Sequence, residues 1–403
     1  MPTYKYKAIS KLGEKLEGTY TAKNKNEVIS MLRQNQNIPV KIEELIEKKD
    51  ILSFDSLKKV KVKDIAIFCR QFYTMLNAGV TVLNVLDTLR LQTENKKLAL
   101  VIGEVYEEVQ KGLTFAESLK RHRKTFPDLL INMVEAGEVS GTLDIIMDRM
   151  AVHYEKENKI TNKIKGAMMY PIILSIVSML VVVFLLTFIM PTFVSMFEGS
   201  GVELPLPTRI LLMISGIIIN YWYFVFTALL LMIWGIKRYI GTSKGQFLMD
   251  HIKFKIPIVK GTTQKVITSR FTRTLSTLLA SGIPLIQALD IVSRIVGNVI
   301  VEKGILKAKE DVRKGIDLAT PIKQMGVFPP MAESMIRIGE ESGALDEILD
   351  KTANFYDEEV EAALQKMTTL IEPIMIVIMA IVVGSIVIAM VMPMFDMMNT
   401  IQM

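Results

Sequence analysis

Carboxylates gather around two copies of a Gly-Glu-x-Ser-Gly turn, and they are the side chains whose spacing could support chemistry. The first group comprises Glu135, Glu138, Asp144 and Asp148, and the second comprises Glu340, Glu341, Asp346 and Asp350. Three interpretations are open. Asp144 and Asp346 fall in a predicted first helical turn, where the positive end of the helix dipole favours an anion by about 0.3–1 kcal/mol. Alternatively, each group is a docking surface for a basic partner, or holds a divalent cation, although the spacing matches no known cation loop.

Other residue patterns that support catalysis are absent from the sequence. It contains neither a Gly-x-x-x-x-Gly-Lys-Ser/Thr phosphate loop nor a His-Glu-x-x-His metal motif. The three histidines, His122, His153 and His251, have no carboxylate or cysteine at ligand spacing. The single cysteine, Cys69, excludes an internal disulfide and a multi-cysteine metal site. We therefore expect no catalytic residue, no enzymatic activity and no cofactor.

The two acidic groups belong to an internal duplication of the chain. Residues 137–144 read GEVSGTLD and residues 339–346 read GEESGALD, which is an offset of 202. Further upstream the offset becomes 203, as between Phe68 and Phe271, so one insertion or deletion separates the copies. Matches held in register over about a hundred residues indicate a copied fold, and a copied fold presents two similar surfaces.

Composition indicates a protein that is partly embedded in a membrane. The 403 residues are 50% hydrophobic and 22% charged, which is too apolar for an ordinary soluble protein and too charged for a pure membrane bundle. Three uncharged stretches, 172–190, 210–236 and 374–392, are long enough to cross a hydrocarbon core, which needs about 20 apolar residues. The net charge of +6 suits anionic lipid head groups beside the spans, and no pattern typical of nucleic-acid binding is present.

Basic residues beside the spans predict the orientation of the chain. Lysines precede the first span, and Lys237 and Arg238 follow the second, whereas the loop between these spans offers only Arg209. We therefore expect the N-terminus and both large polar regions in the cytoplasm, with the short loop and the C-terminus outside.

The predicted organisation is an all-α membrane protein with a small N-terminal α+β module. Two tandem cytoplasmic six-helix bundles each lead into a membrane-spanning helix, and a further span between them restores the orientation. The expected segments are the N-terminal module (1–45), a linker (46–61), bundle one (62–168), span one (169–193), an external loop (194–209), span two (210–236), bundle two (237–370), span three (371–393) and an external tail (394–403).

Local signals support six helices in each bundle. Glycines such as Gly79 and Gly112 fall where helices should end, since glycine adopts the left-handed conformation without strain. Thr114 and Glu117 form a capping box that starts a short fourth helix. The sixth helix is expected to continue into the membrane. Pro171 and Pro373 lie where these helices enter it and should kink them, because proline removes an intrahelical hydrogen bond.

The residues resemble those of the type II secretion F protein family, the inner-membrane platform proteins of type II secretion and type IV pilus machines. The resemblance covers essentially the whole chain. It is carried by the segment 163–171 (KIKGAMMYP), by both Gly-Glu-x-Ser-Gly-x-Leu-Asp runs, and by 204–208 (LPLPT) before the second span. Their tandem arrangement makes the match specific.

The resemblance implies a non-enzymatic platform in the inner membrane. Members couple a cytoplasmic hexameric ATPase to pilin subunits, associate with other inner-membrane assembly proteins, and are at least dimeric. The bundles would contact the ATPase, and the spans would contact pilin helices. Pilus assembly is favoured over secretion, although the sequence offers no discriminator. From another class, a small transporter subunit is the alternative, and it would require a polar path through the spans.

Overall fold

The computed structural model describes residues 3–9, 15–22, 25–35, 37–45, 59–198 and 205–401. Residues up to Lys59 and residues from Val60 onwards form two compact units, and each is described by itself. Most of the expected linker and the middle of the expected external loop lie outside the described residues.

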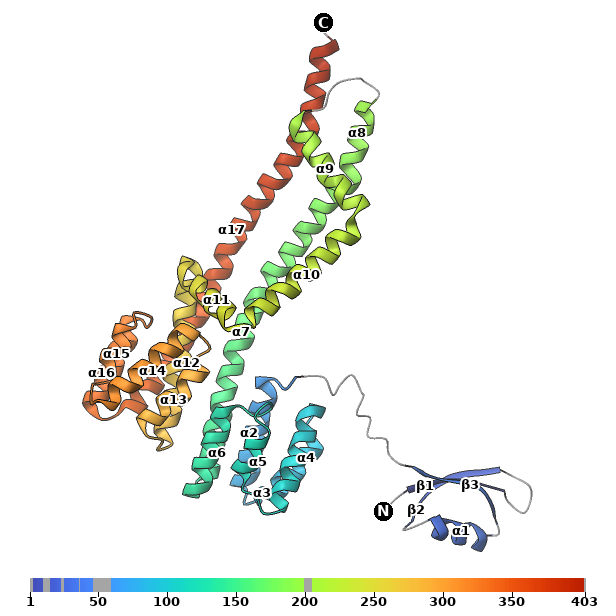
Figure 1. The fold of residues 1–403 in the computed structure, drawn as a ribbon, viewed down its shortest axis with the longest axis vertical. Coiled ribbons are helices and arrows are strands. Elements are labelled where there is room, and N and C mark those ends of the chain that lie inside the picture. The colour runs from blue at the N-terminus through green and yellow to red at the C-terminus, as the bar shows by residue number, and fades with distance from the viewer. Residues whose placement is uncertain are drawn as a thin grey trace. The chain divides into compact units, whose positions relative to one another are not determined.

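The N-terminal unit is a three-stranded antiparallel sheet with one helix (Figure 1). Its elements are β1 (Thr3–Ile9), β2 (Lys15–Thr21), α1 (Lys25–Gln34) and β3 (Ile38–Leu45), with the strand order β2-β1-β3. Tyr4 and Ala8 point to one face of β1 because side chains alternate along a strand. There they pack with Val28 and Leu32, which lie four residues apart on α1. The expected α+β module is confirmed.

Two bundles of six helices follow, and their elements correspond one to one. The first bundle contains α2 (Val62–Asn77), α3 (Val82–Gln92), α4 (Lys96–Gln110), α5 (Phe115–Arg121), α6 (Asp128–Ser140) and α7 (Leu143–Phe184). The second contains α12 (Pro257–Ala280), α13 (Leu285–Ile295), α14 (Val299–Arg313), α15 (Ala319–Gln324), α16 (Pro330–Ser342) and α17 (Leu345–Ile401). The predicted duplicated all-α fold is thereby confirmed.

Equivalent positions in the two bundles form equivalent cores. Residues buried in both copies include Phe68 and Phe271, Leu86 and Leu289, Ile102 and Ile305, Phe126 and Phe328, and Tyr154 and Tyr356. The first of these pairs keep the offset of 203 and the last two keep 202. The inserted residue therefore lies between α5 and α6, in a connection where an extra residue disturbs no helix.

The last helix of each bundle continues as a membrane-spanning helix (Figure 1). In the first copy, α7 passes into a π-helical segment, η2 (Leu185–Ile189), and then α8 (Met190–Glu198), whereas α17 remains α-helical to Ile401. Both helices continue through Pro171 and Pro373 without interruption. The bend expected at these prolines stays a prediction.

The stretch 210–236, expected from hydropathy as the second span, is not one continuous helix. The chain forms α9 (Leu206–Asn220) and α10 (Trp222–Ile240), and Tyr221 interrupts the helix between them with φ −123° and ψ 24°. Helix α10 alone is about 28 Å long at 1.5 Å per residue, which matches a hydrocarbon core of about 30 Å. Aromatic residues occupy one of its ends and Lys237 and Arg238 the other, as is typical of a span. Hydropathy does not register a backbone bend within an apolar run, so α10 is the candidate span here and the bounds 210–236 stay a prediction.

Helix α9 joins the two long helices near their ends. The Thr208 hydroxyl donates to the Ala389 carbonyl of α17 at 2.5 Å, and the Ser215 hydroxyl donates to the Leu186 carbonyl of η2 at 2.5 Å. Both hydroxyls are buried. A buried hydroxyl without a hydrogen bond costs free energy, and these two bonds avoid that cost. After α10, α11 (Ser243–Lys255) leads into the second bundle. Among the described residues, α10 and the long helices α7 and α17 are the three that are long and apolar enough to cross a membrane.

Candidate functional site

The Gly-Glu-x-Ser-Gly turn connects two tightly packed helices in each copy. A Cβ on Gly137 would lie 2.9 Å from Ile146 Cγ1, and one on Gly339 would lie 2.9 Å from Leu345 Cδ1. Only glycine therefore allows α6 to approach α7, and α16 to approach α17, this closely. The second glycines of the turns, Gly141 and Gly343, both have φ 72° and end their helices in the left-handed conformation.

The glutamate of each turn caps a helix elsewhere in its own bundle. Glu138 accepts hydrogen bonds from the backbone N–H groups of Phe115 and Ala116, both at 2.7 Å. Glu340 accepts from Leu318 at 2.6 Å and from Ala319 at 2.9 Å. These N–H groups begin α5 and α15, where backbone donors have no partner within the helix and the dipole favours an anion. This structural role was missed from the sequence, because 23 and 22 residues separate the partners.

An arginine in the first helix of each bundle holds the last helix. Arg70 donates to Asp148 at 2.7 Å and makes two bonds to Glu155, at 2.8 and 2.9 Å. These bonds raise the pKa of the Arg70 guanidinium above its usual range and lower the pKa of the Glu155 carboxyl. The ion pairs therefore join α2 to α7, the helix that continues into the membrane.

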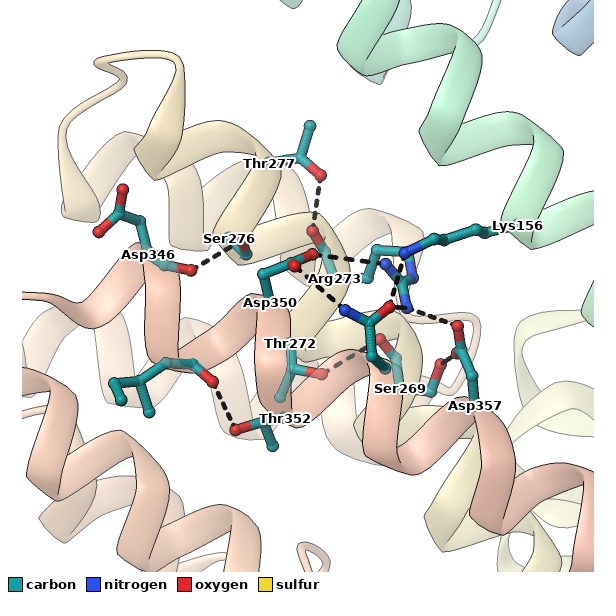
Figure 2. A network of polar contacts seen from close by, with 12 residues as sticks. Lys156, Ser269, Thr272, Arg273, Ser276, Thr277, Asp346, Asp350, Thr352 and Asp357 are labelled. Atoms are coloured by element: carbon teal, nitrogen blue, oxygen red, sulfur yellow. Dashed lines mark hydrogen bonds and ion pairs between the residues drawn. The ribbon is translucent and has the colours of Figure 1, made fainter.

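The equivalent arginine in the second copy, Arg273, is more deeply buried, and its polar contacts are shown in Figure 2. Its side chain is 6% exposed, against 36% for Arg70. Arg273 donates to Asp357 at 2.5 Å and to Asn354 at 3.2 Å, and Asp350 lies 3.6 Å away. The duplication thus repeats the contact between first and last helix, with one carboxylate changed from glutamate to aspartate.

Members of both acidic groups line one cleft of about 340 Å³ between the repeats. Asp148 of the first copy and Asp346 and Asp350 of the second line it, together with Glu347, Arg149, Arg273 and His153. The cations in this cleft already have partners, since Arg149 donates to Ser281 at 3.2 Å and Arg273 bonds Asp357. Figure 2 shows Asp346 and Asp350 beside this network. The Asp346 carboxylate has no partner among the described residues.

The remaining predicted site residues do not line this cleft. Glu135 pairs with Lys120 at 2.5 Å, and Glu138 and Glu340 are occupied as helix caps. Neither Asp144 nor Glu341 has a partner in the part of the chain that the structure describes. In that same part, no three or more His, Cys, Asp or Glu side chains could together hold a metal ion, which gives the cation interpretation no support.

His153 lies at the boundary of the two repeats and is almost completely buried. It is 5% exposed, its Nδ1 has no hydrogen-bond partner, and Glu157 lies 3.9 Å from Nε2. Burial, together with the positive charge of Arg273, lowers the pKa of His153 to about 3. The imidazole is therefore neutral at physiological pH. The equivalent residue of the second copy is Phe355.

Polar contacts continue along α7 and α17 towards the membrane. Lys156 donates to Asn354 at 2.6 Å, Lys163 pairs with Glu361, and the Tyr170 hydroxyl donates to Glu372 at 3.3 Å. The copies have diverged to opposite charges here, since Lys156 and Lys159 correspond to Glu358 and Glu361. Opposite charges favour pairing of unlike copies, and like copies would repel each other.

Comparison with known proteins agrees with this duplicated architecture. The chain matches the family described as type II secretion system (T2SS), protein F, over residues 68–191 and again over 271–393. Residues 1–43 match the family described as type II secretion system protein F, N-terminal domain. Each match to the first family covers most of one bundle and the span that follows it.

Relatives of two kinds share nearly the full length of the chain. The type IV pilus assembly protein PilC of Thermus thermophilus is 38% identical, over 100% of this chain and 99% of its own length. PilC of Pseudomonas aeruginosa is 38% identical, over 88% of this chain and 96% of its own. The type II secretion system protein F of Xanthomonas campestris is 31% identical over 100% of both chains.

The fold, and the junction where the two repeats contact each other through α7, α12 and α17, define a membrane protein built from a duplicated helical domain. The chain belongs to the type II secretion system protein F family.

Proposed function

We propose that this protein is a non-enzymatic platform in the inner membrane for assembly of a type IV pilus. The observation that carries this proposal is the difference in similarity between two kinds of relative. Those named for type IV pilus assembly reach 38% identity, whereas those named for type II secretion reach 31%. A platform of a type II secretion system is the alternative within the family.

In this role the protein couples a cytoplasmic hexameric ATPase to pilin subunits in the membrane. Both bundles face the cytoplasm and the C-terminus lies outside. The pair Lys237 and Arg238 at the end of α10 supports this orientation, because basic residues concentrate on the cytoplasmic side of a span. The protein acts as a dimer or larger assembly, with other inner-membrane assembly proteins and membrane lipid around it.

The acidic cleft between the repeats is the docking surface for a basic segment of a partner. Asp346 supports this assignment, because its carboxylate has no partner among the described residues. Glu138 and Glu340 are less suitable, since both already bind backbone N–H groups inside their bundles. A partner held at this cleft contacts both repeats together, so its movement acts on α7 and α17 simultaneously.

In-cell crosslinking of the tagged full-length protein, gentle extraction and mass spectrometry of the partners test this function. We expect a hexameric assembly ATPase, pilins and other inner-membrane components of the machine. Asp346→Lys should reduce recovery of the ATPase, whereas Glu341→Lys, outside the cleft, should not. Recovery of the protein alone, with solute uptake lost in a deletion strain, would instead favour a transporter subunit.

A further inference from the structure

A mainly apolar crevice of about 460 Å³ lies between the second bundle and the two long helices. Ile164 and Met168 of α7, Val266 of α12, and Leu364 and Met367 of α17 form its walls. Met168 and Met367 lie about 6 and 10 Å along their helices from the predicted starts of the hydrocarbon spans. One side of the crevice is therefore close to the inner face of the membrane.

The crevice contains a cation without a partner. Arg270 of α12 lines it, and its Nε is buried without a hydrogen-bond partner. No ion pair or hydrogen bond joins Arg270 to any side chain in the described part of the chain. The side chain as a whole is only partly buried, but a buried N–H donor without a partner is costly, because water cannot replace the missing hydrogen bond.

The groups around Arg270 do not supply the missing anion. Glu157 of α7 interacts with Arg270 electrostatically, but no hydrogen bond or ion pair joins the two among the described residues. Lys253, the other cation of the crevice, donates to Asp250 at 2.9 Å and is thereby compensated. Asp250 also accepts from the Val299 backbone at 3.0 Å, so its oxygens are occupied.

The unpaired cation belongs to the second repeat only. The equivalent residue of the first repeat is Ile67, which is 42% exposed and apolar. The guanidinium passes Gly297, where a Cβ would lie 3.2 Å from Nη1, so glycine leaves room beside the charge. A site specific to one copy is not required by the shared bundle fold, and this points to a ligand.

We propose that this crevice binds a single-chain anionic amphiphile from the inner leaflet, with its carboxylate or phosphate head on Arg270. The acyl chain follows the apolar walls towards Met168 and Met367. A guanidinium binds either head group through charge-assisted hydrogen bonds. A fatty acid and a lysophospholipid share this chemistry, and the site does not require the pilus function proposed above.

Native mass spectrometry of the full-length protein tests the site directly. The protein is exchanged into a neutral detergent and titrated with oleate, and in parallel with oleyl alcohol, which has the same chain and no charge. We expect one oleate adduct and at least about tenfold weaker binding of the alcohol, since the ionic contact is lost. The mass of the ligand retained before exchange distinguishes a fatty acid from a lysophospholipid.

Variants separate the role of the charge from that of the apolar walls. Arg270→Gln should weaken oleate binding about tenfold and leave the alcohol unaffected, while Arg270→Lys, which keeps the charge but not the planar fork, should weaken oleate binding less than Arg270→Gln does. Arg294→Gln is the matched control, because that cation on α13 is paired with Asp290 at 2.9 Å and lines another cavity. Circular dichroism verifies the fold of each variant. Equal binding of oleate and alcohol, or oleate binding unchanged in Arg270→Gln, would overturn the proposal.

Discussion

Acidification should loosen the junction between the two repeats through His153. The pKa of this buried imidazole is lowered to about 3, whereas an imidazole in an unfolded chain titrates near pH 6.5. Between these two pH values, His153 binds a proton in the unfolded chain but not in the folded protein. Stability contributed by the neutral imidazole is therefore complete above about pH 6.5 and falls as the pH is lowered towards 3.

The size of this effect depends on how far the pH lies below the pKa of the histidine in the unfolded chain. At pH 5.0 the cost is about 1.5 pH units multiplied by 1.36 kcal/mol, or about 2 kcal/mol. Local opening of α7 around His153 should then become about 30-fold more frequent than at pH 7.5. No discount for solvent screening is needed, because the side chain is 5% exposed.

Hydrogen exchange with mass spectrometry, corrected for intrinsic rates at each pH, measures this opening. The duplication supplies the control variant, His153→Phe, since the second copy carries Phe355 at the equivalent position. Other groups titrate in both proteins, so the difference between them isolates the histidine. Equal acceleration in the wild type and in His153→Phe would refute the reasoning.

Three further predictions concern the contacts that hold each bundle together. Gly137→Ala should cost about 1–3 kcal/mol in thermal unfolding by forcing α6 from α7, whereas Gly103→Ala, which faces open space within α4, should not destabilise; equal costs would contradict the close-approach argument. Arg273→Leu should cost about 2–3 kcal/mol by the same assay, because Asp357, 22% exposed, loses its cation, and Arg70→Leu should cost less than half of that; the reverse order would refute the role of burial. Glu138→Ala should speed amide exchange at the start of α5 by about 5- to 30-fold, since a lost helix cap costs about 1–2 kcal/mol, and unchanged exchange there would count against capping.

Much of the fold could be predicted because it depends on local signals. Glycine stops, the capping box at Thr114 and the constant offsets are visible in neighbouring residues, and they define six helices per copy. The position of the second span could not be obtained in this way. Hydropathy is continuous through Tyr221, and the sequence signal for α10 as the candidate span is the separation of its aromatic start from Lys237.

The roles of the acidic residues depended on tertiary contacts. Glu138 resembles a surface carboxylate in its own turn, and only the fold brings it to the N-terminus of α5. The meeting of Asp148 and Asp346 in one cleft likewise requires the packing of two repeats. A useful sequence signal was nevertheless present. Glu138 and Glu340 occupy equivalent positions in the two copies, as do the starts of α5 and α15, and this repetition indicates a role in the shared fold.

The continuity of α17 has a mechanical consequence. Its 57 residues form one continuous helix of about 85 Å that includes Pro373 and Pro393, so a tilt of about 5° at Leu345 becomes a lateral shift of about 7 Å at Ile401 if the helix moves as one body. The first copy changes to π-helical winding at Leu185, whereas α17 stays α-helical to Ile401. Equal rotations of the two bundles would therefore displace the far ends of the two long helices by different distances.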